Sequence, residues 1–167
     1  MVAAEVPELT YKGRVISPYI KNKEDFILEI TSNAVQTVAA NQDVLFTNVA
    51  VPGNSSTVHR SGSGQVTLRG LTNCQCRARF RVSFGGNIAV PADGTVGPIS
   101  LAIAIDGEPI NTTTMIYTPT AVSTYGNIFG AIFIDIPRGC CGKISVRNIS
   151  TIPVSVQNAN LIVERVA

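Results

Sequence analysis

Hydrophobic and polar positions alternate along most of this chain with a period of two, most clearly in its last quarter. Ile132, Ile134 and Ile136 begin a series of apolar runs that continues to Val163. Prolines, glycines and asparagines interrupt the series at intervals of roughly 8 to 12 residues. Because a period of two places successive side chains on opposite faces of a strand, the pattern predicts an all-β, antiparallel sandwich or barrel.

The predicted strands are short, and no segment shows the 3.6-residue period of a helix. They cover residues 37–39, 43–49, 65–68, 78–84, 99–105, 113–117, 127–136, 143–148, 154–157 and 159–166. Residues 54–65 and 85–98 are rich in Gly, Ser and Pro, so they are expected to form loops.

Residues 101–105 and residues 128–136 are apolar on both faces of the predicted strands. A sandwich strand with one solvated face would alternate with polar residues instead. The second face therefore needs a cover, and the simplest cover in an all-β chain is another copy of the same protein. Phe129 and Phe133 are the candidate subunit or particle contacts.

Length and composition favour one domain that is poor in charge. The chain has 167 residues, of which 14% are charged and 45% are hydrophobic, against about a quarter charged in an ordinary soluble domain. The formal net charge of +2 and the lack of Lys/Arg runs argue against a nucleic-acid partner. No apolar run approaches the ~18 residues of a membrane span and no signal peptide is evident, so we expect cytosolic synthesis without membrane insertion.

Charge is concentrated near the N-terminus, where residues 1–30 hold nine of the charged side chains. We interpret residues 1–34 as an N-terminal arm that acts as an attachment segment, and residues 35–167 as a compact jelly-roll domain. The alternative is that residues 26–31 form a core strand, in which case the arm is the first hairpin of the sheet.

Six segments carry a resemblance to a known family. They are QDVLFTNVAV (42–51), HRSGSGQVTL (59–68), CRARFRVSFGGNIAV (76–90), ISLAIAIDGEPI (99–110), FIDIPRGCCGKISVRNIS (133–150) and VQNANLIVERVA (156–167). In this order they resemble the jelly-roll domain of tumour necrosis factor ligands, complement globular heads, bacterial spore-surface tip domains and phage fibre domains. The resemblance implies a ten-strand jelly roll that assembles as a homotrimer, with an N-terminal segment leading to a stalk or anchor.

The sequence departs from the eukaryotic and collagen-stalk members of that group. It has no Gly-X-Y tract ahead of the domain, and no signal peptide or transmembrane anchor is evident. What remains resembles a phage structural protein, made in the bacterial host cytoplasm and located in the virion. By analogy with such proteins, its partners would be itself and the capsid or tail.

Four cysteines are present: Cys74, Cys76, Cys140 and Cys141. The first two share strand parity with Phe80, so we expect their thiols to point inward. Buried thiols are the favoured interpretation, with a disulfide between the two pairs or a four-thiolate zinc site as alternatives. The C-x-C and C-C spacings differ from the C-x₂-C of zinc ribbons, so no metal or cofactor is expected.

Arg77, Arg79 and Arg81 alternate with the inward set and form a ladder on the opposite face of their strand. Guanidinium groups about 6.6 Å apart need carboxylates or carbonyls beside them. The ladder is either a solvated outer face or a subunit or particle contact, and the second interpretation is favoured. The candidate partners are Asp106, Glu108, Asp135 and Glu164.

No catalytic motif accompanies His59, the only histidine, so the protein is not expected to be an enzyme. The leading hypothesis is a phage virion structural protein, a trimeric jelly roll that serves as capsid decoration, cement or fibre head. The alternative is an adhesin module that binds a host receptor or glycan through its loops. In that case His59, Tyr117 and Tyr125 are the candidate ligand contacts.

Overall fold

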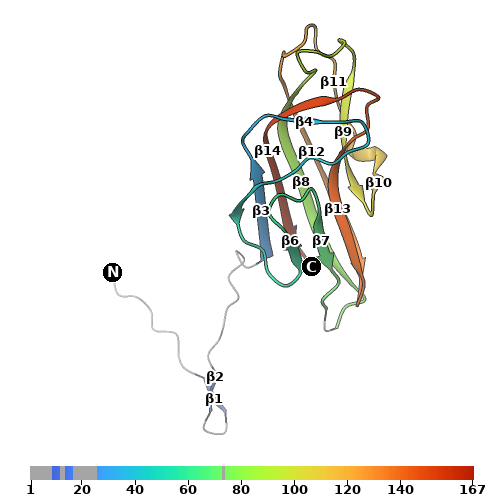
Figure 1. The fold of residues 1–167 in the computed structure, drawn as a ribbon. Coiled ribbons are helices and arrows are strands. Elements are labelled where there is room, and N and C mark those ends of the chain that lie inside the picture. The colour runs from blue at the N-terminus through green and yellow to red at the C-terminus, as the bar shows by residue number, and fades with distance from the viewer. Residues whose placement is uncertain (1–8, 12–13, 17–25, 73) are drawn as a thin grey trace, which may run out of the picture.

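The computed structural model describes residues 9–11, 14–16, 26–72 and 74–167 (Figure 1). Its body is a sandwich of two antiparallel sheets. Sheet 1 has the strand order β12-β8-β14-β3-β5, with β4 paired to β14. Sheet 2 has the order β10-β9-β13-β7-β6, with β11 paired to β9. The prediction of an all-β antiparallel sandwich is confirmed.

The strands have the following bounds. In sheet 1 they are β3 Ile27–Ser32, β4 Gln36–Val38, β5 Asn48–Val51, β8 Arg77–Ala89, β12 Gly126–Pro137 and β14 Val154–Arg165. In sheet 2 they are β6 Thr57–His59, β7 Val66–Arg69, β9 Ile99–Ile105, β10 Glu108–Pro109, β11 Met115–Tyr117 and β13 Cys141–Asn148. A short 3₁₀ helix, η2 Asn111–Thr113, precedes β11, and β1 Leu9–Tyr11 pairs with β2 Arg14–Ile16.

The core lies between the two sheets and is built mainly from alternate side chains of their strands, with Val44 and Phe46 added from the segment between β4 and β5. Phe46, Phe80 and Phe84 are among its largest fully buried members. The rings of Phe46 and Phe84 meet edge to face, with centroids 6.4 Å apart and planes at 78°, which is a favoured aromatic geometry. At about 1.5–3 kcal/mol for each large apolar side chain, burial of this set provides most of the driving force for folding.

Strand β3 lies inside sheet 1, between β14 and β5. Leu28 and Ile30 belong to the core. The predicted boundary at residue 34 is therefore corrected, because the body of the fold already includes residues 27–32. The structure agrees with the alternative hypothesis, in which residues 26–31 form a core strand.

The apolar run 101–105 is covered within its own chain. Ala102 and Ala104 are fully buried, in register with Arg147 and Ser145 of β13. The guanidinium of Arg147 is held by the Asp43 carboxylate at 3.1 Å and by the carbonyl of Gly107. The expectation that a second copy covers this run is wrong, since methyl groups are small enough to be buried by neighbouring side chains.

Two predicted breaks are absent from the strands. Residues 85–89, expected in a loop, continue β8, and the two predicted strands after residue 153 form the single strand β14. A register shift between Gln157 and Asn160 interrupts the pairing of β14 with β8, and Asn158 adopts a φ of 53° there. The Asn-rich stretch therefore marks a bulge inside a strand.

Candidate functional site

The outward face of β12 carries an exposed apolar strip formed by Phe129, Ala131 and Phe133, called the aromatic strip below. The two phenylalanines are 65% and 62% exposed. Ile128 and Ile134 alternate with them and are buried in the core. Because β12 is an edge strand of sheet 1, the strip follows an open border of the sandwich.

Next to the strip, the neighbouring strand presents small or polar residues. Phe129 lies opposite Gly85 of β8, and Phe133 lies opposite Arg81. A Cβ added at Gly85 would lie 3.8 Å from the ring of Phe129. Glu164 of β14 follows Arg81 in the same cross-strand row. The border of the sheet is thus apolar, and the region beside it is polar.

Strand β11, at the edge of sheet 2 next to β12, carries another exposed apolar side chain, which points out of sheet 2. Ile116 is 67% exposed, whereas its neighbour Met115 is buried. A Cβ added at Gly130 of β12 would lie 3.0 Å from the sulfur of Met115, so β11 and β12 lie side by side. The sequence analysis missed Ile116, although its place between Met115 and Tyr117 in a period-two run marks it as outward.

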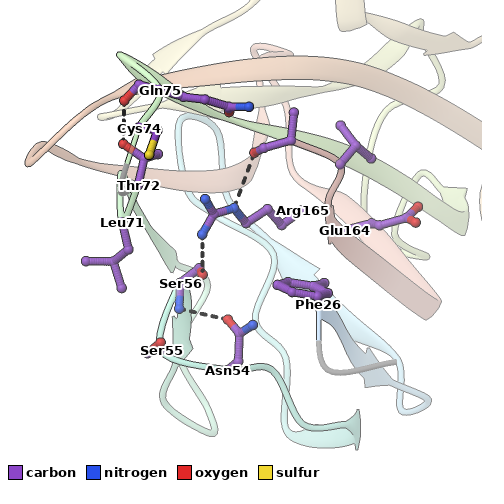
Figure 2. A pocket seen from close by; sticks show the side chains of 12 residues that line it. Phe26, Asn54, Ser55, Ser56, Leu71, Thr72, Cys74, Gln75, Glu164 and Arg165 are labelled. Atoms are coloured by element: carbon purple, nitrogen blue, oxygen red, sulfur yellow. Dashed lines mark hydrogen bonds between the residues drawn. The ribbon is translucent and has the colours of Figure 1, made fainter. Parts of the chain in front are cut away.

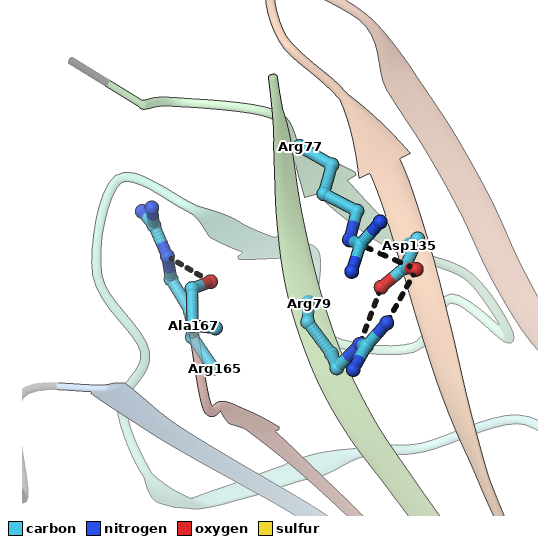
Figure 3. A network of polar contacts seen from close by, with 5 residues as sticks. All are labelled: Arg77, Arg79, Asp135, Arg165 and Ala167. Atoms are coloured by element: carbon cyan, nitrogen blue, oxygen red, sulfur yellow. Dashed lines mark hydrogen bonds and ion pairs between the residues drawn. The ribbon is translucent and has the colours of Figure 1, made fainter. Parts of the chain in front are cut away.

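The arginine ladder is partly neutralised within the chain (Figure 3). Arg79 donates two hydrogen bonds to Asp135, from Nε to Oδ1 at 2.7 Å and from Nη2 to Oδ2 at 2.9 Å. Arg77 Nε lies 3.2 Å from Asp135 Oδ2. Of the four candidate partners, Asp135 is the one that forms these ion pairs, and it is a residue of the same chain. A further role of Arg77, Arg79 and Arg81 in contacts between molecules stays a prediction.

These contacts change the proton affinity of both groups. The hydrogen bonds from Arg79 hold the pKa of Asp135 below its ordinary value, and the positive charges of Arg79 and Arg77 act in the same direction. The same carboxylate raises the pKa of Arg79 above its ordinary value. Both groups are therefore charged at neutral pH.

The expected inward orientation of Cys74 and Cys76 is wrong, because both are exposed free thiols. Strand β8 begins at Arg77, so its alternation reaches the core only from Ala78 onward. Cys140 and Cys141 are also exposed and free. Buried thiols, the favoured interpretation, are thereby excluded for all four cysteines.

The three candidate ligand residues do not form one site. His59 belongs to strand β6, not to a loop, and its Nδ1 lies 3.1 Å from the carbonyl oxygen of Gln65. His59 pairs with Val66, Val66 with Ile144, and Ile144 with Ile105, so His59 lies in the cross-strand row of Ile105 at one end of β9. Tyr117 pairs with Ile99 at the other end of β9. At 3.3 Å per residue, the two levels are about 20 Å apart.

The two tyrosines do lie close to each other. Tyr117 packs against the core, and its ring occupies the space where a Cβ of Gly126 would lie. Tyr125, the residue before Gly126, is 39% exposed. Of the three candidates, Tyr125 is therefore the one that presents substantial surface.

An open pocket of about 900 Å³ lies at the end of the sandwich near Phe26 and Arg165 (Figure 2). The guanidinium of Arg165 donates to Ser56 Oγ and to the carbonyl oxygen of Ala167, both at 3.2 Å. Asn54 Oδ1 accepts a hydrogen bond from the Ser56 amide at 2.8 Å. Several polar groups of the pocket are thus already paired with one another.

Within residues 9–11, 14–16, 26–72 and 74–167, no group of three or more His, Cys, Asp or Glu side chains is arranged to hold a metal ion. In the same part of the chain, no helix combines the length and the apolar character needed to cross a membrane.

No protein-family model matches the sequence, and no curated protein matches it. Solved structures match the fold instead. Eiger TNF from S. frugiperda is similar with a TM-score of 0.62 at 12% identity, over 85% of this chain and 92% of that one. Murine APRIL has a TM-score of 0.57 at 9% identity, over 83% of this chain and 98% of its own. The globular domain of zebrafish complement 1qA protein has a TM-score of 0.55 at 12% identity, over 84% and 95%.

These likenesses define the class of the fold. The sandwich is a jelly roll of the kind found in tumour necrosis factor and complement 1q domains, as the sequence resemblance predicted. Identities of 9 to 12% support a common fold and carry no function by themselves.

Proposed function

We propose that this protein is a non-enzymatic display module that assembles as a homotrimer through the aromatic strip of β12. The observation that carries the proposal is the exposure of Phe129 and Phe133, 65% and 62%, on the same face of one strand. Aromatic residues and arginine are enriched at protein interfaces, and contiguous exposed apolar patches commonly mark them.

The energetics favour a cover over this border. Removing a phenylalanine side chain from water contributes about 1.5–3 kcal/mol, so each protomer has several kcal/mol to gain from the strip. The Arg79–Asp135 pair beside it is satisfied within the chain, so a partner can approach without leaving that charge unpaired. The stoichiometry of three follows from the resemblance to trimeric jelly rolls.

We further propose that the module belongs to a phage virion, on the capsid or the tail, as decoration, cement or fibre head. Support comes from the low charge content, from the charged N-terminal segment ahead of the body, and from the resemblance to phage fibre domains. Residues 1–25 lie before the first strand of the body and attach the trimer to its particle. A host glycan or receptor contact is the second candidate, favoured by the exposed ring of Tyr125.

Light scattering tests the assembly. The native chain should give three times the 17.7 kDa chain mass at micromolar concentration. The double variant Phe129→Ser, Phe133→Ser should be monomeric with an unchanged β-rich circular dichroism spectrum, because both side chains point away from the core. The matched control is Leu45→Ser, Val96→Ser, which changes two other exposed apolar residues and should stay trimeric. A monomeric native chain would refute the proposal.

The particle assignment needs a separate measurement. Mass spectrometry of purified phage particles from the source should detect the protein, and neighbouring genes should encode capsid, portal or tail proteins. If the protein is absent from particles and the isolated trimer binds host cell surfaces, the adhesin alternative replaces the virion role.

A further inference from the structure

The four exposed thiols are not equivalent, and two of them lie in segments that are joined to each other. Cys76 directly precedes β8, and Cys140 directly precedes β13. The Arg138 amide donates a hydrogen bond to the carbonyl oxygen of Cys76 at 2.9 Å. The Cys140 amide donates to the carbonyl oxygen of Pro137 at 3.0 Å, which closes a tight turn. The two segments lie next to each other at the lower end of the sandwich in Figure 1.

Cys76 and Cys140 each lie one residue outside a strand, at positions that share the parity of its inward residues. Cys76 continues the inward parity of Ala78 and Phe80 in sheet 1, and Cys140 continues that of Gly142 and Ile144 in sheet 2. Both lie just beyond the buried part of their strands, which explains why the thiols are exposed. Cys76 therefore lies at the end of a strand of sheet 1, and Cys140 lies at the end of a strand of sheet 2.

Backbone hydrogen bonds hold the chain segments of this pair together. A disulfide requires Cα atoms about 4.4–6.8 Å apart. Antiparallel neighbours such as Cys76 and Arg138 have Cα atoms roughly 4.5–5.5 Å apart. Cys140 is only two residues beyond Arg138, and its carbonyl oxygen accepts a hydrogen bond from the Gly70 amide at 2.9 Å. The bond requires a movement of the turn, in which Gly139 has a φ of 77°.

The other two cysteines are directed elsewhere. Cys74 lines the open pocket beside Thr72 and Gln75, as Figure 2 shows. A hydrogen bond of 2.6 Å from Thr72 Oγ1 to the carbonyl oxygen of Gln75 orders that segment. Cys141 has the opposite parity to Cys140, so it lies on the outward face of sheet 2.

We propose that Cys76 and Cys140 form a reversible disulfide that joins the two sheets once the protein leaves a reducing cytosol. The oxidant is a low-molecular-weight disulfide such as oxidised glutathione. One cysteine thiolate attacks a sulfur of oxidised glutathione, forms a mixed disulfide and releases one glutathione thiolate. The second cysteine thiolate then attacks the protein sulfur of the mixed disulfide and releases the second glutathione. The protein loses two protons and two electrons, and oxidised glutathione becomes two reduced glutathiones.

The bond would constrain the unfolded chain over the long segment from residue 76 to residue 140. Closing a long loop lowers the entropy of the unfolded state, so the oxidised form should be the more stable one. We expect the Tm of the oxidised protein to exceed that of the reduced protein by on the order of 10 °C. The proposal is independent of trimer formation, since both cysteines belong to one chain.

Peptide mapping tests the pairing on the full chain. After oxidised glutathione treatment and blocking of free thiols, trypsin should yield a linked pair of peptides, 70–77 and 139–143. Each peptide contains two cysteines, so single variants make the assignment. Cys74→Ala and Cys141→Ala should retain the link and the Tm increase, and Cys76→Ala and Cys140→Ala should lose both. All four residues are exposed, so these changes should leave folding intact, which far-ultraviolet circular dichroism checks.

Two outcomes would overturn the proposal. One is a full set of four titratable thiols after exposure to oxidised glutathione. The other is a link that persists in Cys76→Ala or Cys140→Ala, or one that joins separate chains on a non-reducing gel.

Discussion

Arg79 and Asp135 lie opposite each other in the β8–β12 ladder, and the guanidinium donates to both carboxylate oxygens. The pair is 56 residues apart in sequence and forms on the outward face of sheet 1. It keeps the centre of the arginine ladder ordered beside the aromatic strip. A bidentate pair of this kind fixes the relative orientation of the two side chains in addition to its favourable interaction energy.

The first prediction concerns the pH dependence of this pair. The folded pKa of Asp135 lies below its ordinary value, so the pair stabilises the fold above the unfolded pKa, about 3.9. That contribution is lost as pH falls through the folded pKa. In urea unfolding, Asp135→Asn should be slightly less stable than the native chain at pH 7, and the difference should shrink below about pH 4.

Asp93→Asn is the matched control, because Asp93 forms no ion pair with any residue that the structure describes. It should unfold like the native chain at pH 7. An Asp135→Asn difference that is unchanged at pH 3 would contradict the role of the carboxylate charge.

The second prediction concerns Asn148, which is fully buried. Its side-chain nitrogen donates to the carbonyl oxygens of Val38 and Ile152 at 3.0 and 2.9 Å. Its Oδ1 accepts from the amide and the hydroxyl of Ser150. Asn148→Ala leaves these groups without a partner, so it should cost about 2–4 kcal/mol in denaturant unfolding. Asn127→Ala removes a surface amide and should change stability by less than about 0.5 kcal/mol.

The third prediction concerns the close approach of two chain segments at Gly70. A Cβ at this position would overlap the carbonyl oxygen of Pro137 and lie 2.9 Å from its carbonyl carbon. Gly70→Ala therefore forces the backbone apart and should cost about 1–3 kcal/mol. Gly97→Ala meets nothing within 4 Å and serves as the control. Equal melting temperatures for the two variants would refute this account.

The fourth prediction separates the arm from the body with two truncations. Removing residues 1–25 should leave a soluble trimer that no longer joins its particle, because β3 and the core remain complete. Removing residues 1–34 also removes β3, exposes a face of sheet 1 and should give insoluble protein. If the chain without residues 1–25 still binds the particle, the attachment site must lie in the loops or in the arginine ladder instead.

The sequence by itself determined the all-β architecture and the face of most strands. Alternation with period two is a local property, so Ile128 and Ile134 could be assigned to the core and Phe129 and Phe133 to the outside before any contact was known. The jelly-roll class was also accessible, through the resemblance of six sequence segments to a known family.

Tertiary structure decided the features that depend on pairing between distant segments. The register of β8 and β12 places Asp135, and no other candidate carboxylate, opposite Arg79. The pairing of β9 with β13 leaves Ala102 and Ala104 buried within one chain. The start of β8 at Arg77 left Cys76 outside the core and beside the turn of Cys140. Local alternation gives the direction of a side chain within a strand, but where a strand ends and what lies across from it depend on the packing of the whole sandwich.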